Sequence, residues 1–161
     1  MMQATTVLLR IAVGMAVALA PVAASADVVW QLGKKQGLPY LQGMPSESES
    51  DTQFWALCRA GGVVEIGVGA DSNVGEGKGE PVALTLTSGP ARATLSGQSR
   101  NSANFQMTAG TELRARISRR HDLFVVLAGE QPIKVSGSIK PVTWPVNGLK
   151  AKVAAFLQAC Q

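Results

Sequence analysis

Residues 82–99 read Val-Ala-Leu-Thr-Leu-Thr-Ser-Gly-Pro-Ala-Arg-Ala-Thr-Leu-Ser-Gly-Gln-Ser, two short runs on either side of a Ser-Gly-Pro turn. In the first run Val82, Leu84 and Leu86 alternate with small or polar residues. Alternation with a period of two is typical of an antiparallel strand that packs on one face and meets water on the other. Because Gly and Pro favour tight turns, the stretch predicts a β-hairpin.

The same rhythm extends in both directions along the chain. From Asp27 to about Ser138, Gly, Pro, Asn and Ser recur at short intervals between runs rich in Val, Leu, Thr and Phe, and Gly61-Gly62 marks a second hairpin. This spacing indicates an all-β domain, and we expect neighbouring strands to form a meander. The predicted strands are 28–34, 52–58, 63–69, 82–88, 91–99, 104–108, 112–119, 122–127 and 131–138.

The C-terminal tail has a different period. After the segment 141–145, which begins and ends with Pro, apolar residues recur at offsets of 4, 7, 8 and 11, namely Leu149, Val153, Phe156, Leu157 and Cys160. These offsets place them on one stripe of an amphipathic helix within 147–161, with Asn147 as the expected N-cap. We expect the stripe to pack on the sheet, so that Phe156→Asp unfolds this end of the protein.

The N-terminus has the features of a secretory signal peptide. A positive charge at Arg10 precedes the apolar run 11–20, and Ala24-Ser-Ala26 fits a small-x-small cleavage site. We therefore expect residues 1–26 to be removed and one domain, 27–161, to act in the periplasm or outside the cell. A membrane anchor is the alternative, but the run is shorter than the ~20 residues a bilayer requires, and no later segment is long enough to span one.

Cys58 and Cys160 are the only two cysteines of the chain. In an oxidising compartment such a pair usually forms a disulfide, so we expect Cys58 to be bonded to Cys160 and the C-terminal helix to be tied to the domain. In the chain-entropy model, closing a loop of about 100 residues stabilises the fold by roughly 4 to 5 kcal/mol. A redox role is the alternative, and the lack of a C-x-x-C spacing disfavours it.

Composition narrows the class of protein further. The 161 residues are 46% hydrophobic and 16% charged with 17 Gly and 8 Pro, which fits neither a disordered chain nor a long coiled coil. One His and two Cys cannot supply a multi-histidine centre or the usual structural zinc sites. We expect a monomer without metal or cofactor.

Two loops have unusual compositions. The acidic segment 46–51, Ser-Glu-Ser-Glu-Ser-Asp, and the glycine-rich segment 70–80, which begins with Asp71 and Asn73, each supply oxygen ligands of the kind that calcium prefers. The second loop lacks the glutamate that completes a calcium loop, and it has no Gly-Lys-Ser/Thr for phosphate binding. A solvated turn is therefore the favoured interpretation of the acidic segment, and a flexible hairpin loop that of the glycine-rich segment.

Charge is distributed unevenly between the halves of the predicted mature chain. Residues 27–80 contain four basic and eight acidic residues, a net charge of −4, whereas residues 81–161 contain ten basic and three acidic residues, a net charge of +7. The densest positive segment supplies a candidate anion or partner patch of Arg114, Arg116, Arg119, Arg120 and His121. Guanidinium groups suit phosphates and carboxylates of envelope components.

The alternative for this patch is a solubilised strand face that pairs with the acidic first half of the chain, or a sheet edge whose charges guard it against aggregation. Nucleic acid is disfavoured as a ligand by the predicted compartment and by an aromatic content of 5%.

The sequence contains no motif that indicates catalysis. The closest approach to G-x-S-x-G is 97–101, Gly-Gln-Ser-Arg-Asn, which lacks the final Gly, and no S-x-x-K is present. The only histidine, His121, stands between Arg120 and Asp122 at a predicted turn, where a surface role is expected. We therefore expect a protein that is not an enzyme.

In residues 38–62 a Gly-x-Pro loop is followed by a strand that ends in Cys58 and glycines, and residues 147–160 end in Leu-Gln-Ala-Cys. These two blocks resemble small exported proteobacterial proteins of poorly known function. The second block is similar to the ending of the periplasmic accessory family associated with type VI secretion, although Leu57 replaces the basic residue expected before the first Cys. The resemblance implies a non-enzymatic envelope protein with an antiparallel β-sandwich and a disulfide-tethered C-terminal helix.

These observations favour a mainly β protein, either a single antiparallel β-sandwich or a partly open barrel, with one C-terminal amphipathic helix tied by a disulfide. The leading functional hypothesis is a non-catalytic periplasmic binding or accessory module that contacts an envelope protein or an anionic envelope component. An inhibitor of a cell-wall lytic enzyme is the first alternative, by analogy of fold. A hydrolase without a recognisable motif is the second.

Overall fold

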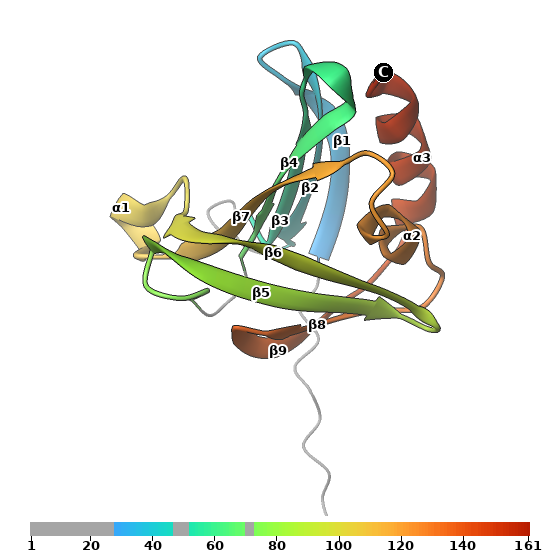
Figure 1. The fold of residues 1–161 in the computed structure, drawn as a ribbon. Coiled ribbons are helices and arrows are strands. Elements are labelled where there is room, and N and C mark those ends of the chain that lie inside the picture. Colours follow the sequence, from blue (N-terminus) through green and yellow to red (C-terminus); the bar gives the residue numbers. More distant parts are fainter. Residues whose placement is uncertain (1–27, 47–51, 70–72) are drawn as a thin grey trace, which may run out of the picture.

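The computed structural model of the protein describes residues 28–46, 52–69 and 73–161 (Figure 1). The predicted signal peptide lies outside these residues, as do Asp71 and the three carboxylates of the acidic loop. The described strands are β1 (Val28–Lys35), β2 (Leu38–Pro45), β3 (Phe54–Cys58), β4 (Val63–Val68), β5 (Lys78–Ser88), β6 (Ala91–Asn101), β7 (Thr111–Ser118), β8 (Ile133–Gly137) and β9 (Ile139–Trp144).

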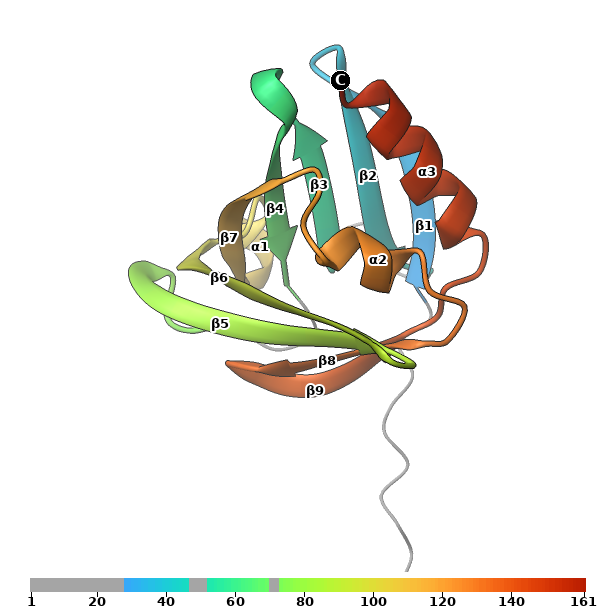
Figure 2. The ribbon, with the colours of Figure 1, turned by 45° about the vertical axis from the view of Figure 1, so that its right-hand side comes forward.

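All of these strands belong to one antiparallel sheet with the order β1-β2-β3-β4-β7-β6-β5-β8-β9. Figure 2 shows β1 to β4 standing upright and β5, β6, β8 and β9 crossing below them, so that the sheet curls into a nearly closed barrel. The predicted mainly β class is confirmed, and of the two expected architectures the partly open barrel is the one observed. The expected meander holds within β1 to β4, within β5 to β7 and for β8 and β9, and these three runs are joined by the pairs β4–β7 and β5–β8, which link strands far apart in the sequence.

The predicted hairpin at 82–99 is the centre of one half of this sheet. Leu84 pairs with Leu95 and Leu86 with Ala93, and Val82, Leu84 and Leu86 are buried while Ala83 is exposed. The Gly61-Gly62 connection is confirmed as well, as a single 3-10 turn (Ala60–Gly62) between β3 and β4. Alternating hydrophobicity thus identified the first hairpin, because one of its faces lies in the core, and the paired glycines of the turn identified the second.

Side chains rather than backbone bonds close the gap between the two edge strands. The Trp30 indole on β1 donates a hydrogen bond of 2.7 Å to the Pro145 carbonyl just after β9. Its ring centroid lies 6.0 Å from that of Trp144 and 5.7 Å from that of Phe54, both in tilted or edge-on contacts. These aromatic pairs fill the seam and fix how the two halves of the sheet meet.

The predicted C-terminal helix is α3 (Leu149–Ala159), which lies beside β1 and β2 (Figures 1 and 2). Its stripe of Leu149, Val153 and Phe156 is buried, and the Phe156 ring stacks at 6.1 Å on Phe124. Asn147 is not the N-cap. Gly148 takes that position with a φ of +67°, a left-handed conformation that glycine adopts without strain.

The predicted disulfide between Cys58 and Cys160 is confirmed, with a Cα–Cα distance of 5.5 Å. It joins the end of β3 to the end of α3, and both cysteines are buried. The Arg119 guanidinium strengthens the same junction because its Nη1 donates to the Cys160 carbonyl at 3.1 Å. The C-terminus is therefore attached by a covalent bond and by a charge-assisted hydrogen bond.

Two predicted strands are helices instead. The segment 104–108 contains α1 (Phe105–Thr108), which ends at Ala109 in a left-handed conformation, and 122–127 contains α2 (Leu123–Leu127). In α2 every residue except Val125 is buried, a pattern that follows the turn of a helix. An uninterrupted apolar run of five residues carries no period, so its sequence does not separate strand from helix.

Two strands were missed because of proline. The β2 strand has Pro39 and Pro45 near its two ends, and β9 contains Pro141. Proline lacks the N–H that a central strand requires, so such segments are not predicted as strands. In the structure β9 is an edge strand, where proline is tolerated, and β2 pairs with β3 through four residues between its prolines, Tyr40 to Gly43.

Candidate functional site

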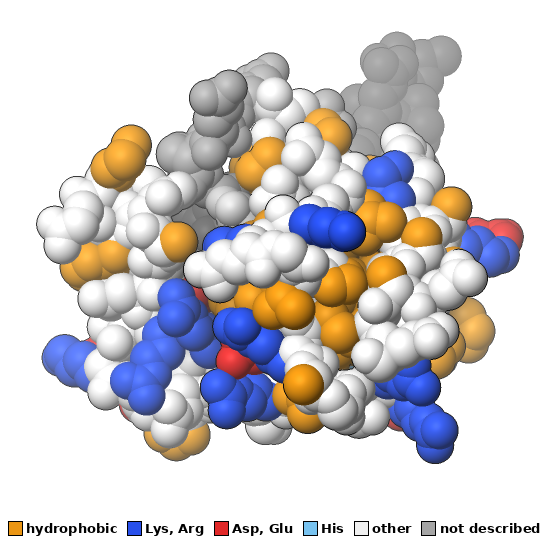
Figure 3. Space-filling model, turned by 90° about the horizontal axis from the view of Figure 1, so that it is seen from above, with side chains coloured by type: hydrophobic (Ala, Val, Ile, Leu, Met, Phe, Trp, Pro, Cys, Tyr) orange, Lys and Arg blue, Asp and Glu red, His pale blue; other side chains and the backbone are white. Residues whose placement is uncertain are grey.

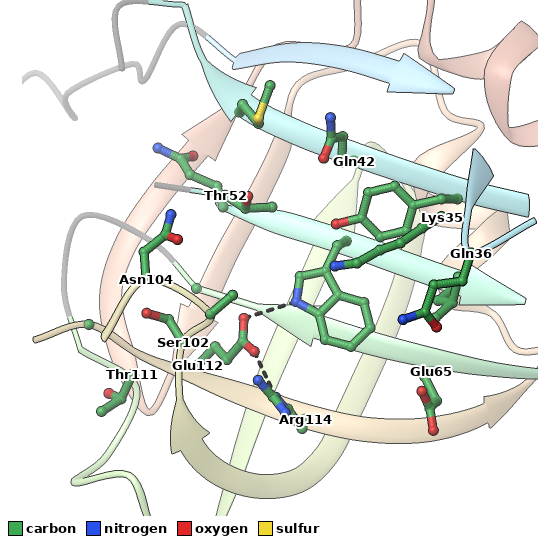
Figure 4. A pocket seen from close by; sticks show the side chains of 18 of the residues that line it. Lys35, Gln36, Gln42, Thr52, Glu65, Ser102, Asn104, Thr111, Glu112 and Arg114 are labelled. Atoms are coloured by element: carbon green, nitrogen blue, oxygen red, sulfur yellow. Dashed lines mark hydrogen bonds and ion pairs between the residues drawn. The ribbon is translucent and has the colours of Figure 1, made fainter. Parts of the chain in front are cut away.

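The face of β2, β3, β4 and β7 that points away from the core holds a groove of about 650 Å³. The turn between β1 and β2 and the loop that precedes α1 supply its two ends; Figure 4 shows Lys35 and Gln36 on one side and Ser102 and Asn104 on the other. The groove is lined by Lys34, Lys35, Gln36, Tyr40, Gln42, Met44, Thr52, Gln53, Trp55, Leu57, Arg59, Glu65, Gly69, Ser102, Ala103, Asn104, Gly110, Thr111, Glu112 and Arg114.

Strand alternation explains how one sheet carries both a core and a groove. On β3, Phe54 and Ala56 are buried in the core, whereas Trp55, between them, points to the opposite face and is partly exposed. On β4 and β7 the same rule directs Glu65 and Arg114 outward. Each strand therefore contributes every second side chain to the groove.

Trp55 lies flat across β4 in the middle of the groove. Gly67 is its cross-strand partner, and a Cβ atom on Gly67 would fall 1.9 Å from the indole Nε1. Only glycine leaves room for the ring at this position, because any side chain would displace it. One face of the indole is thus packed on backbone, while the ring lines the groove.

Glu112 fixes the orientation of this ring. Its Oε2 accepts the Trp55 indole N–H at 2.9 Å, and its Oε1 accepts Arg114 Nε at 2.7 Å (Figure 4). The glutamate is only 3% exposed, although it lies on the outward face of β7 with Arg114. The guanidinium of Arg114 lies 5.9 Å from the centre of the Trp55 ring, so one carboxylate holds both an aromatic and a cationic group in place.

A second ion-pair cluster borders the groove at Glu65. Arg59 Nη2 lies 2.7 Å from one of its carboxylate oxygens and Arg116 Nη2 lies 2.8 Å from the other. The hydrogen bond from Arg59, followed by that from Arg116 and by both charges, lowers the pKa of Glu65 although its partial burial acts in the opposite sense. Glu65 is therefore held as a carboxylate near neutral pH.

Tyr40 and the two neighbouring lysines form the end of the groove near the β1–β2 turn. Lys35 Nζ lies 5.1 Å from the centre of the Tyr40 ring, a cation–π contact. Burial raises the pKa of the Tyr40 hydroxyl, and the negative charge of Glu112 raises it further. Within the described part of the chain, neither Lys34 nor Lys35 has an ion-pair partner.

A second hollow of about 480 Å³ adjoins the groove. It shares Trp55, Glu65 and Arg114 with the first hollow and continues over β7 to residues 96–98 of β6. Gly97 allows β6 to pack closely on β7 at this hollow, because a Cβ atom on Gly97 would lie 2.2 Å from the Arg114 carbonyl oxygen. Trp55 therefore lies at the junction of two hollows that together form an extended depression.

The structure separates the five residues of the predicted basic patch. Arg114 and Arg116 point to the outer face and are paired with Glu112 and Glu65, and Arg119 bonds to the Cys160 carbonyl. Arg120 is exposed, while His121 Nδ1 accepts the Leu123 N–H at 3.1 Å and so helps to begin α2. Only Arg114 and Arg116 line the hollows, and anion binding by the whole patch stays a prediction.

Sequence reasoning missed Tyr40, Trp55 and Glu112 as site residues. Strand alternation puts Glu112 on the same face of β7 as Arg114 and Arg116, but it gives no sign that a tryptophan from another strand covers this glutamate. The one available signal was Gly67 in a strand otherwise rich in Val and Ile, because glycine inside a strand often marks a close approach by another group.

In the glycine-rich segment, backbone amides donate hydrogen bonds to the side chain of Glu80. Lys78 N–H donates to the Glu80 carboxylate at 3.0 Å, and Glu76 N–H donates to the other carboxylate oxygen. These amide hydrogen bonds, that of Glu76 first, lower the pKa of Glu80. Among the described residues, no group of three or more His, Cys, Asp and Glu is placed to hold a metal ion.

No protein family, no curated protein and no solved structure was found that matches this chain. The resemblance to exported proteobacterial proteins, including the type VI secretion-associated accessory family, therefore stays a prediction. Over the part of the chain that is described, no helix is long and apolar enough to cross a membrane.

Proposed function

We propose that the protein is a non-catalytic binding or accessory module of the bacterial envelope, which reaches the periplasm after loss of residues 1–26 and binds through the groove around Trp55. The observation that carries this proposal is the fixed pair of Trp55 and Arg114 on one buried carboxylate, Glu112. The groove volume of about 650 Å³ lies within the ~300–1,000 Å³ of typical ligand sites. A ring and a guanidinium held in advance lose little entropy on binding.

The state of the acidic groups in the groove supports a binding role over hydrolysis. A general acid needs a pKa near the working pH, whereas the pKa of Glu65 is lowered by Arg59 and Arg116. Glu112 already accepts two hydrogen bonds, which leaves less of its capacity for a proton transfer. Both carboxylates serve better as fixed anchors for neighbouring side chains.

Export itself is supported by the disulfide, because such bonds persist mainly outside the cytoplasm. N-terminal sequencing of the protein recovered from the periplasm tests this point, and we expect Asp27 as the first residue. Recovery of the intact N-terminus in the cytoplasmic fraction would contradict it.

The binding role is tested by co-sedimentation of the purified, oxidised protein with isolated outer membranes and with isolated cell-wall sacculi. We expect retention by one of these fractions and a loss of roughly tenfold or more with Trp55→Ala, while the remote charge variant Lys134→Gln behaves as wild type. Near-UV circular dichroism verifies that the variants fold. Equal retention of Trp55→Ala and wild type would refute binding through the groove. A separate assay measures whether the two proteins inhibit a wall-lytic enzyme, and equal inhibition by both would favour the alternative function of an inhibitor.

A further inference from the structure

The groove also indicates which chemical class of ligand it takes, an inference that rests on the binding role just proposed. We propose that it binds a segment of an acidic polysaccharide: one sugar ring stacks on the indole of Trp55, and carboxylates of the same chain pair with Lys34 and Lys35.

The stacking step follows from the position of Trp55. Its ring lies flat on the Gly67 backbone, is held at its N–H by Glu112, and lines both hollows. One face of a pyranose ring consists of C–H groups, which are apolar, whereas its hydroxyl groups point outward in the ring plane. Burying such a face on an aromatic plane removes apolar surface from water and leaves the hydroxyls free to bond to polar side chains around it.

The surroundings of the indole supply those polar partners. Gln42 on β2, Thr52 before β3 and Glu65 on β4 border the groove, and Figure 4 shows the amide of Gln42 and the carboxylate of Glu65 on different sides of its centre. Amides both donate and accept hydrogen bonds and carboxylates accept them, so together they can serve the donor and acceptor sides of sugar hydroxyls. The lining is thus suited to a ligand with many hydroxyl groups around a flat apolar face.

The charge of the groove selects an acidic glycan. Its other cations, Arg59 and Arg114, are each paired with a glutamate, whereas Lys34 and Lys35 have no ion pair among the described residues. Among the described lining residues, positive charge is therefore in excess at the end near the β1–β2 turn. Figure 3, which views the end of the molecule that carries this turn, shows Lys and Arg side chains far outnumbering Asp and Glu.

The position of the groove in the sheet disfavours an extended peptide. A peptide that binds by strand addition needs a free sheet edge, and the groove lies over β2, β3, β4 and β7, each of which has a hydrogen-bonded neighbour on both sides. The two adjoining hollows instead fit a chain that crosses the Trp55 face and continues over β7. A polymer of sugars needs no backbone hydrogen bonds from the sheet.

Intrinsic fluorescence provides a site-specific test. Of the three tryptophans, Trp30 is 4% and Trp144 0% exposed, so Trp55 alone is accessible to a stacked ring. The oxidised protein is titrated with oligogalacturonate, with oligomannuronate and with peptide-free glycan strands from cell walls, all of which carry carboxylates. The matched control ligand is methyl-esterified oligogalacturonate, which has the same sugar chain without its charge.

We expect at least one acidic glycan to change the Trp55 emission saturably, and the change to weaken with added salt. The esterified glycan and the double variant Lys34→Gln, Lys35→Gln should each bind about five- to tenfold more weakly, because exposed ion pairs contribute ~0.2–1 kcal/mol each. The control variant Lys134→Gln, which removes one lysine charge away from the groove, should bind as wild type. Because Trp55→Ala lacks the reporting fluorophore, its affinity for the acidic glycans is measured by calorimetry, and we expect no binding.

The outcomes separate this inference from the proposed function. The glycan assignment would be overturned if none of the three acidic glycans changed the Trp55 emission, or if the esterified form bound as tightly as the acidic form. A dT oligonucleotide is titrated as a competing polyanion, and tighter binding of it than of the glycans would also overturn the assignment. If Trp55→Ala nevertheless abolishes retention by an envelope fraction, the binding role stands and only the ligand class is wrong. If Trp55→Ala is retained like wild type and no glycan binds, both proposals fail.

Discussion

The bond between Cys58 and Cys160 should supply a large part of the stability of this fold. The two residues are 102 positions apart, so the bond closes a loop that contains β4 to β9 and the three described helices. In the chain-entropy model, this loop length corresponds to about 4 to 5 kcal/mol at 25 °C. Domains are typically stable by about 5–15 kcal/mol, so the loss of this bond should bring the protein close to unfolding at growth temperature.

The double variant Cys58→Ala, Cys160→Ala is the suitable perturbation. Both cysteines are buried, at 5% and 0% exposure, and alanine removes the bond without placing a new polar group in the core. Urea denaturation followed by far-UV circular dichroism should show a free energy of unfolding lower by about 4 kcal/mol. The slope with urea should increase, because the unfolded chain without the cross-link exposes more surface.

Reduced wild-type protein is the internal control, and its stability should match that of the double variant to within about 1 kcal/mol. A difference below about 2 kcal/mol between oxidised wild type and the variant, with an unchanged slope, would refute the reasoning. In that case α3 would be held by its packing on β1, β2 and Phe124 alone.

Three further predictions concern the core, the groove and the pH dependence. Phe156→Ala, at a fully buried ring stacked on Phe124, should lower the free energy of unfolding by about 3 to 5 kcal/mol in urea, and a loss below 1 kcal/mol would show that α3 is not part of the core. Gly67→Ala should displace the Trp55 ring and shift its emission maximum, while an unchanged spectrum would contradict the flat placement. Because the pKa of Glu65 is lowered in the folded state, its ion pairs stabilise the protein above the usual carboxyl pKa of 4.5 and are lost as the pH falls through the lower folded value. The stability difference between wild type and Glu65→Gln should therefore be largest near neutral pH and vanish in acid, and a constant difference would be the contrary result.

Local patterns in the sequence were sufficient wherever a segment has one buried and one wet face. The hairpin at 82–99 and the apolar stripe of α3 repeat their apolar residues with the period of their own secondary structure, so both were predicted correctly. The same reasoning failed for α2, whose residues are almost all apolar, and for β2, whose prolines conceal a strand. In those segments the local pattern is ambiguous, and packing against neighbouring elements determines whether the segment forms a helix or a strand.

The groove illustrates the other limit. Trp55, Glu112 and Arg114 come from β3 and β7, and the contact between them depends on the pairing of both strands with β4. No spacing in the sequence encodes that register, because it arises from how the whole sheet curls. Alternation can place each of these residues on the outward face of its strand. It cannot show that a tryptophan from one strand buries a glutamate of another.

The sequence by itself determined the β-rich class, the C-terminal helix and the pairing of the only two cysteines, because these follow from local periodicity and from the count of one residue type. The tertiary structure alone decided the order of the strands, the closure of the sheet by Trp30 and Trp144, and the groove with its fixed indole. Those features are contacts between residues far apart in the chain, and their free energy exists only once the sheet has formed.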